Sequence, residues 1–135
     1  FTGPVALINA FADVCEQRKH GFIVGISSVA GDRGRQSNYI YGTAKGALNF
    51  FRQGLRNRLH KVGVQVLTIN PGFVDTPMTA AFPKGPLWAT PEKVAVDIDK
   101  AIEKNKDVLY TPGFWMLIML IIKSIPEKLF KRLSL

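Results

Sequence analysis

The sequence is poor in the residues that build disulfide frameworks and metal centres. It has one cysteine, Cys15, and two histidines among 135 residues. An intramolecular disulfide is therefore excluded, and no His/Cys cluster indicates a metal site. The thiol lies on the apolar side of a predicted helix, which favours a buried, unreactive cysteine over a nucleophile. This sparing use of cysteine is consistent with a reducing compartment, and we expect a cytoplasmic protein.

Acidic residues are also few, and no hydrophobic run is long. The chain has 18 Lys and Arg against 10 Asp and Glu, a net charge of +8. The basic residues are dispersed and do not alternate with aromatic residues in a recognisable module, so nucleic acid is not an expected partner. Repulsion that keeps the protein soluble, or attraction to an anionic surface or substrate, explains the charge. The apolar run at 114–122 is much shorter than the about twenty residues that span a bilayer.

What the chain does contain is a block, 21–45, with the pattern of a strand, a polar loop and the start of a helix. Its first residues are apolar and rich in β-branched side chains, which predicts a strand covered on both faces. Ser28 follows the strand, and Tyr41 and Lys45 stand one helical turn apart on the same helix face. Ligands bind at the carboxyl ends of strands in an open parallel sheet, so we expect these side chains to meet in one crevice.

A hydroxyl, a phenol and an ammonium in one crevice suit hydride transfer between a carbonyl and a nicotinamide. A free tyrosine has a pKa of about 10, and a nearby lysine cation lowers that value toward neutral pH. A serine hydroxyl can hydrogen-bond the carbonyl oxygen where charge develops. The spacing alone is also that of an ordinary solvated helix turn, and serines after a strand are common in loops and helix caps.

Two motifs in sequence order resemble the short-chain dehydrogenase/reductase family. Ser28-Val-Ala-Gly, followed by Tyr41-Gly-Thr-Ala-Lys45, is similar to the family's catalytic segment. Asn70-Pro-Gly-Phe-Val-Asp-Thr76 is similar to its nicotinamide-side motif, and the likeness reaches about Tyr110. The resemblance implies an α/β fold with a doubly wound parallel sheet of the Rossmann type.

The resemblance also implies roles for individual residues. Ser28, which directly precedes Val-Ala-Gly, would be the catalytic serine, and Tyr41 would be the acid/base. Lys45 would hold the cofactor ribose and promote proton exchange by the tyrosine. The cofactor would be NADP or NAD, contacted by Tyr41, Lys45, Pro71, Gly72, Val74 and Thr76.

Several parts of the family's domain do not occur in the chain. They are the first strand, the glycine-rich TGxxxGxG turn that cradles the pyrophosphate, and the residue that selects NAD or NADP. The family's fourth catalytic residue, an asparagine, would fall just before Phe1. We therefore expect residues 1–113 to be the C-terminal part of such a domain, followed by a helical tail at 114–135.

Two long helices are predicted, one opening at Gly3-Pro4 and one at about 39–61. Apolar residues at helical spacing, Phe11 among them, mark the core side of the first helix. In the second helix Arg52 and other arginines lie mostly off the apolar face. Phe50 and its neighbour Phe51 cannot both face one core, which supports a homo-oligomer through these helices. A long surface helix with one exposed aromatic residue explains the pattern equally well.

The segment 75–90 is predicted to be a loop with a short helical piece at 78–82. Its apolar side chains, including Met78, Phe82 and Trp88, suit a lid over an apolar substrate, or ordinary packing onto the sheet. Thr90-Pro91 then begins a helix with a good cap, and a short strand is expected at 108–110.

The tail joins the apolar run 114–122 to a stretch with Lys123, Lys128, Lys131 and Arg132. Such a pattern suits an interfacial helix at an anionic membrane, and equally a helix packed on the core or across an oligomer. The tail resembles that of reductases acting on polyprenyl-phosphate-linked keto sugars. A lipid-linked substrate would explain the lid and the tail together.

Taken together, these features predict an NAD(P)-dependent oxidoreductase acting on CH–OH groups, with a small carbonyl or alcohol substrate that is lipid-linked or apolar. We expect it in the cytoplasm or at the inner face of the membrane. Two alternatives stay open: a non-catalytic Rossmann-type binding protein, and a membrane-surface scaffold whose tail is the functional part.

Overall fold

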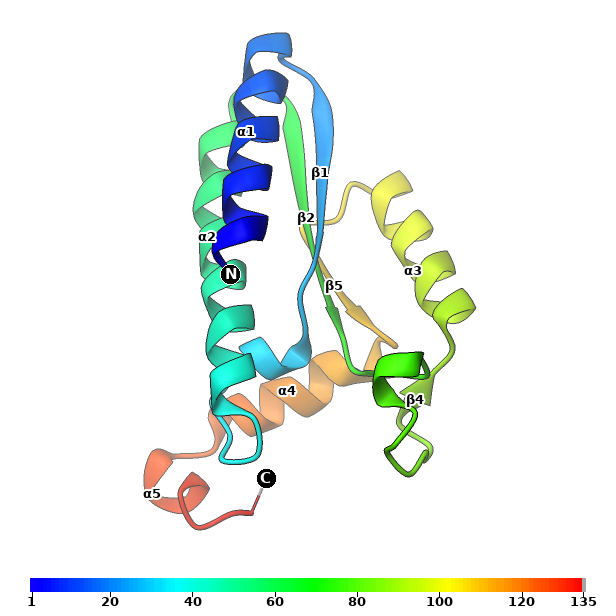
Figure 1. The fold of residues 1–135 in the computed structure, drawn as a ribbon. Helices are drawn as coiled ribbons and strands as arrows, with labels where there is room; N and C mark the ends of the chain where they lie inside the picture. Colours follow the sequence, from blue (N-terminus) through cyan, green and yellow to red (C-terminus); the bar gives the residue numbers. More distant parts are fainter. Residues whose placement is uncertain (135) are drawn as a thin grey trace.

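A parallel sheet lies between helices in the computed structural model, which describes residues 1–134. The central strand β2 (Val64–Pro71) pairs in parallel with β1 (Gly21–Ile26) on one side and with β5 (Val108–Thr111) on the other. The helices α1 (Thr2–Arg18) and α2 (Tyr39–His60) lie on one side of this sheet, and α3 (Pro91–Glu103) lies on the other (Figure 1). This arrangement confirms the predicted α/β class with a doubly wound parallel sheet.

Two apolar clusters hold the layers together. On one face of the sheet Val64 and Val66 of β2 pack with Ile23 of β1 and with buried side chains of α1 and α2. On the other face Leu67 and Ile69 pack against α3 and β5. Apolar residues on both faces are what the parallel strand of an α/β sheet requires.

The edge strand β1 differs from the prediction of a strand covered on both faces. Phe22, Val24 and Ile26 expose large parts of their side chains, whereas Ile23 is buried. The expectation is wrong for the described residues because α3 packs against β2 and β5, which leaves one face of β1 open.

Two side chains of the long helices differ from the prediction in their burial. Arg52 was expected mostly off the apolar face of α2, but it is only 1% exposed. Its guanidinium donates hydrogen bonds to the carbonyl of Gly25 in β1 and to Leu48 O at 3.2 Å. Phe11, expected in the core stripe of α1, is exposed, because Ala12 is the residue of that turn that faces the sheet.

The connection after β2 is less helical than expected. A 3₁₀ turn, η2 (Pro77–Thr79), replaces the predicted helical piece at 78–82. The two-residue strands β3 (Phe73–Val74) and β4 (Trp88–Ala89) pair in parallel and close the loop. Met78 and Phe82 point largely into solvent, so they do not pack onto the sheet.

The C-terminal segment folds into α4 (Phe114–Ser124) and the short α5 (Glu127–Phe130). The helix α4 crosses beneath the carboxyl ends of the strands (Figure 1). Its Trp115 and Met119 are buried against Val29, while Met116, Leu117, Leu120 and Ile121 are exposed. Within residues 1–134 no helix is long and apolar enough to cross a membrane. Residue 135, the last of the predicted tail, lies outside the described part.

Candidate active site

The chain leaves β1 through two serines that face different ways. The Ser27 hydroxyl is buried and donates to Lys45 O at 3.2 Å, which ties the strand end to α2. Ser28 has an extended backbone and caps the 3₁₀ turn η1 (Val29–Gly31), where its Oγ accepts a hydrogen bond from Ala30 N at 3.1 Å. A hydroxyl that accepts from a backbone N–H keeps its own hydrogen free to donate. Of the two serines, therefore, Ser28 offers a donor to the space beyond the strand.

Tyr41 and Lys45 project from the first turns of α2, as their spacing predicts. Tyr41 is half exposed, and the Lys45 ammonium lies 5.6 Å from the centre of its ring. Burial lowers the pKa of Lys45 from its usual value, and the positive charge of Arg52 lowers it further. The lysine makes no ion pair with an acidic residue within 1–134, so its donors are available to a ligand.

A pocket of about 170 Å³ joins the strand end, the start of α2 and the loop after β2. Four of the predicted site residues line it: Ser28, Tyr41, Gly72 and Val74. The structure thus brings together residues from both sequence motifs, which lie more than thirty positions apart.

Three further predicted residues lie beside this pocket and do not line it. Lys45 lies one turn further along α2 from Tyr41, and Pro71 is the last residue of β2. Thr76 caps η2, and its backbone N–H donates to Thr79 Oγ1 at 3.1 Å. The Thr79 hydroxyl in turn donates to Val74 O at 2.6 Å, which fixes the backbone of the pocket wall.

Sequence reasoning missed several residues that line the pocket. Arg35 and Asn38 come from the loop between the serine and the tyrosine, and Arg35 Nε and Asn38 Oδ1 are buried without a hydrogen-bond partner in the described chain. Their place between Ser28 and Tyr41 was the available signal. Trp115 enters from the tail, and no spacing in the sequence connects it with the two motifs.

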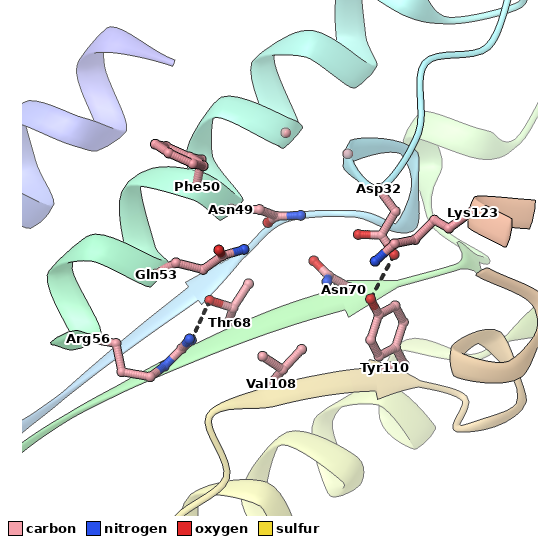
Figure 2. Close-up of a pocket in the computed structure, with 12 residues that line it drawn as sticks. Asp32, Asn49, Phe50, Gln53, Arg56, Thr68, Asn70, Val108, Tyr110 and Lys123 are labelled. Atoms are coloured by element: carbon pink, nitrogen blue, oxygen red, sulfur yellow. Dashed lines mark hydrogen bonds between the residues drawn. The ribbon is translucent and has the colours of Figure 1, made fainter. Parts of the chain in front are cut away.

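A second, larger pocket of about 230 Å³ lies between α2, β2 and β5 (Figure 2). It contains none of the predicted site residues, and its amide oxygens Asn49 Oδ1 and Asn70 Oδ1 have no partner in residues 1–134. The Tyr110 hydroxyl donates to Asp32 Oδ2 at 2.7 Å. Burial, together with this bond to a carboxylate, raises the pKa of Tyr110 to about 12. The Tyr110 hydroxyl is therefore already engaged in a hydrogen bond within the fold.

This chain matches a family model and proteins of other organisms. The model described as short chain dehydrogenase matches residues 1–86. An uncharacterised oxidoreductase of Streptomyces coelicolor is 35% identical over 135 residues, covering 98% of this chain and 53% of the relative. One from Mycobacterium tuberculosis is 35% identical over 133 residues, with the same coverage. The chain therefore spans about half the length of the curated relatives it matches.

Solved structures share the fold at lower identity. A short-chain dehydrogenase from Burkholderia cenocepacia, in complex with NADP, superimposes with a TM-score of 0.85 at 21% identity and covers 100% of this chain and 56% of its own. One from Sphingobium yanoikuyae, in complex with NADPH, gives 0.72 at 23% identity, over 90% of this chain and 52% of its own. At such identities the likeness concerns the fold.

Proposed function

The chain belongs to the short-chain dehydrogenase family, and from that premise we propose that it forms the catalytic part of an NAD(P)-dependent oxidoreductase that interconverts a carbonyl and an alcohol. The observation that supports this most is the shared pocket of Ser28, Tyr41, Gly72 and Val74. If Tyr41 and Lys45 were only an exposed pair on a helix turn, there would be no reason for residues of two other segments to share a pocket with Tyr41.

In this proposal each polar side chain has one task. Tyr41 exchanges a proton with the oxygen of the substrate as general acid or base. Ser28 donates a hydrogen bond to the same oxygen, where negative charge develops during reduction. The Lys45 ammonium lies 5.6 Å from the centre of the Tyr41 ring, where it would hold the nucleotide ribose beside the phenol.

The residues present are compatible with a nicotinamide nucleotide, which when bound supplies the hydride chemistry. Lys45 is a partly buried cation without an acidic partner in the described chain, as suits a group that binds ribose hydroxyls. We assign the other contacts to the nucleotide to backbone and hydroxyl groups of the segment at the end of β2 and after it. The nucleotide would be NADP or NAD, held by Tyr41, Lys45, Pro71, Gly72, Val74 and Thr76.

The test replaces the phenol while keeping the ring. In the complete protein, Tyr41→Phe should lower kcat by about 10²- to 10⁴-fold, the usual contribution of a positioned acid/base group. Nucleotide affinity should change little, because the ring and Lys45 remain. Tyr39→Phe is the matched control, since Tyr39 is exposed and lies outside the pocket. Undiminished turnover by Tyr41→Phe would remove the tyrosine from the mechanism. Nucleotide binding without turnover by the wild-type protein would favour a non-catalytic binding protein instead.

We further propose that the substrate is apolar or lipid-linked and that the tail touches an anionic membrane surface at the inner face of the membrane. The observation that favours this is the exposed side of α4, which carries Met116, Leu117, Leu120 and Ile121. Lys123 follows this surface, and three further basic residues lie in the stretch from Lys128 to Arg132. Apolar side chains beside cations are the composition of interfacial helices. The likeness of the tail to reductases of polyprenyl-phosphate-linked keto sugars belongs to the same proposal.

Vesicle sedimentation tests the membrane contact. The complete protein should sediment with vesicles rich in anionic lipid and much less with neutral vesicles, and Leu117→Ser/Leu120→Ser should abolish the difference. Lys84→Ser is a control at an exposed cation of another loop. Equal sedimentation with and without residues 114–135 would remove the membrane contact, and would remove the scaffold alternative with it.

The long helices also suit a homo-oligomer, as the family resemblance implies. Phe50 on α2 is 79% exposed, and Leu7 and Phe11 on α1 are exposed as well. We propose that this surface contacts a second copy. Phe50→Glu should then convert the oligomer to a smaller species in light scattering, and an unchanged mass would exclude the contact.

A further inference from the structure

The tail reaches the candidate catalytic pocket with one large side chain. Trp115, the second residue of α4, lines the same pocket as Ser28 and Tyr41, and it is 4% exposed. We infer that α4 forms one wall of the catalytic pocket and that Trp115 is a specificity-determining residue for ring-bearing carbonyl substrates. The inference rests on the proposed oxidoreductase function and adds the substrate class and the element that selects it.

The position of Trp115 depends on a glycine of the second motif. A Cβ atom built on Gly72 would overlap the indole, so the ring occupies the space that a side chain at this position would need. Phe73 packs edge-on against Trp115 with ring centres 5.5 Å apart, and it stacks on Trp88 at 5.3 Å. Both distances lie in the range of favourable aromatic pairs. Trp115 is therefore part of an aromatic cluster, not an isolated side chain.

Arg33 links the C-terminal tail to the loop between Ser28 and Tyr41. Its Nη1 donates to Ile122 O at 2.5 Å and to Ile125 O at 2.6 Å, at the C-terminal end of α4. Its Nη2 pairs with Glu127 at 3.1 Å, and its guanidinium lies 3.7 Å from the ring centre of Phe130. A cation that satisfies the free carbonyls at a helix end also interacts favourably with the helix dipole. Arg33 is thus a positioning residue for the wall.

A second link lies one residue earlier in the same loop. Asp32 accepts the hydrogen bond from Tyr110, which anchors the loop to β5 just before α4 begins (Figure 2). Lys123, near the end of α4, lines the same pocket as Asp32 and Tyr110 (Figure 2). The start and the end of α4 are therefore both joined to the segment between Ser28 and Tyr41.

The lining of the pocket indicates what the wall would contact. The lining combines the polar side chains of Ser28, Asn38 and Tyr41 with the aromatic rings of Phe73 and Trp115, whose indole Nε1 has no hydrogen-bond partner in the described chain. A carbonyl that reaches the hydroxyl groups would place an attached ring against the aromatic wall. A small acyclic ketone would reach the same hydroxyl groups without using the wall.

The test compares two substrates in the complete protein with NAD(P)H. We expect Trp115→Leu to lower the ratio of kcat/KM for an aryl methyl ketone to that for 2-butanone by about tenfold, and Trp115→Phe to keep most of it. Binding of the aryl ketone, measured by calorimetry in the presence of oxidised nucleotide, which has no hydride to transfer, should weaken by a similar factor. Met119→Leu is the control, because Met119 is buried on the same helix outside the pocket. Trp115→Met, which also lacks the ring, serves if Trp115→Leu does not fold.

Arg33→Met tests the positioning role. It keeps the alkyl chain and removes every donor, so the substrate ratio should fall as in Trp115→Leu while nucleotide affinity is kept. Proteolysis of the tail should become faster, whereas Lys131→Met should change neither property.

The outcomes separate the inference from the proposed function. No reduction of either ketone by the wild-type protein would remove both. Turnover with a substrate ratio that Trp115 variants leave unchanged would remove the inference and keep the function. A uniform loss with both ketones, together with weaker nucleotide binding, would place Trp115 against the cofactor instead, and this too overturns the inference.

Discussion

Replacing Gly72 by alanine gives a direct test of the contact between the second motif and the tail. The added methyl group would overlap the Trp115 indole, whose ring is buried and cannot swing into solvent without losing its contacts. Overpacking of this kind costs about 1–3 kcal/mol. Trp115→Leu removes the overlapping ring and leaves a cavity, at a cost below the about 3–5 kcal/mol of a Trp→Ala change. Since Gly72→Ala meets no indole in that background, its cost there should fall to about 0.5 kcal/mol or less.

The assay is urea unfolding of the four proteins of this double-mutant cycle, followed by circular dichroism and analysed by linear extrapolation. The coupling free energy between the two sites should be about 1–3 kcal/mol, because the whole cost of Gly72→Ala depends on the indole. Gly85→Ala is the matched control, since a Cβ at that exposed position has no atom within 4 Å. Equal costs of Gly72→Ala with and without Trp115 would refute the packing of the tail against the second motif.

Two further predictions concern stability and ionisation. Thr90→Ala should lower the free energy of unfolding by about 1 kcal/mol, because Thr90 Oγ1 accepts the Lys93 N–H at 3.2 Å as the cap of α3; Thr90→Ser should restore it, and an unchanged denaturation midpoint would contradict the cap. Tyr110 has its pKa raised to about 12 from 10.0, so its contribution to stability is present below pH 10 and is lost as pH rises toward 12. Tyr110→Phe should remove the absorbance step of tyrosinate near pH 12, and persistence of that step would refute the raised pKa.

The features that the sequence predicts well are those in which local pattern and tertiary structure agree. The apolar run at β1, the helix expected at about 39–61 and the cap at Thr90 all led to elements that the structure contains. Ser28, Tyr41 and Gly72 line one pocket, whereas Lys45, expected in the same crevice, lies one helical turn beyond Tyr41 and does not line it. In each case the information lies within a few residues or in a known strand order, which fixes which strand ends are neighbours.

The features that the sequence predicts poorly depend on contacts between segments that are distant in the sequence. Arg52 looks like a surface cation by helical spacing, yet it is buried because Gly25 leaves room over β1 and offers a carbonyl to its guanidinium. The spacing of residues within one helix cannot predict that a cation of that helix fills the space above a glycine of a strand, because the two residues belong to different segments. Trp115 entered the pocket unpredicted for the same reason. Its neighbours there belong to segments that precede it by more than thirty residues.

The distribution of arginine also changes how the net charge of +8 should be interpreted. Arg33 and Arg52 donate to backbone carbonyls inside the fold, and Arg56 does the same at Val66 O, at 2.8 Å. Guanidinium groups engaged in this way stabilise strand and helix ends and add little to an attractive surface, because their donors are already occupied. The cations that face solvent freely include those of the tail, beside the exposed apolar side of α4. Binding to an anionic vesicle should therefore weaken much more on removal of two of the positive charges at 123–132 than on removal of Arg52 and Arg56 from the sheet side of α2.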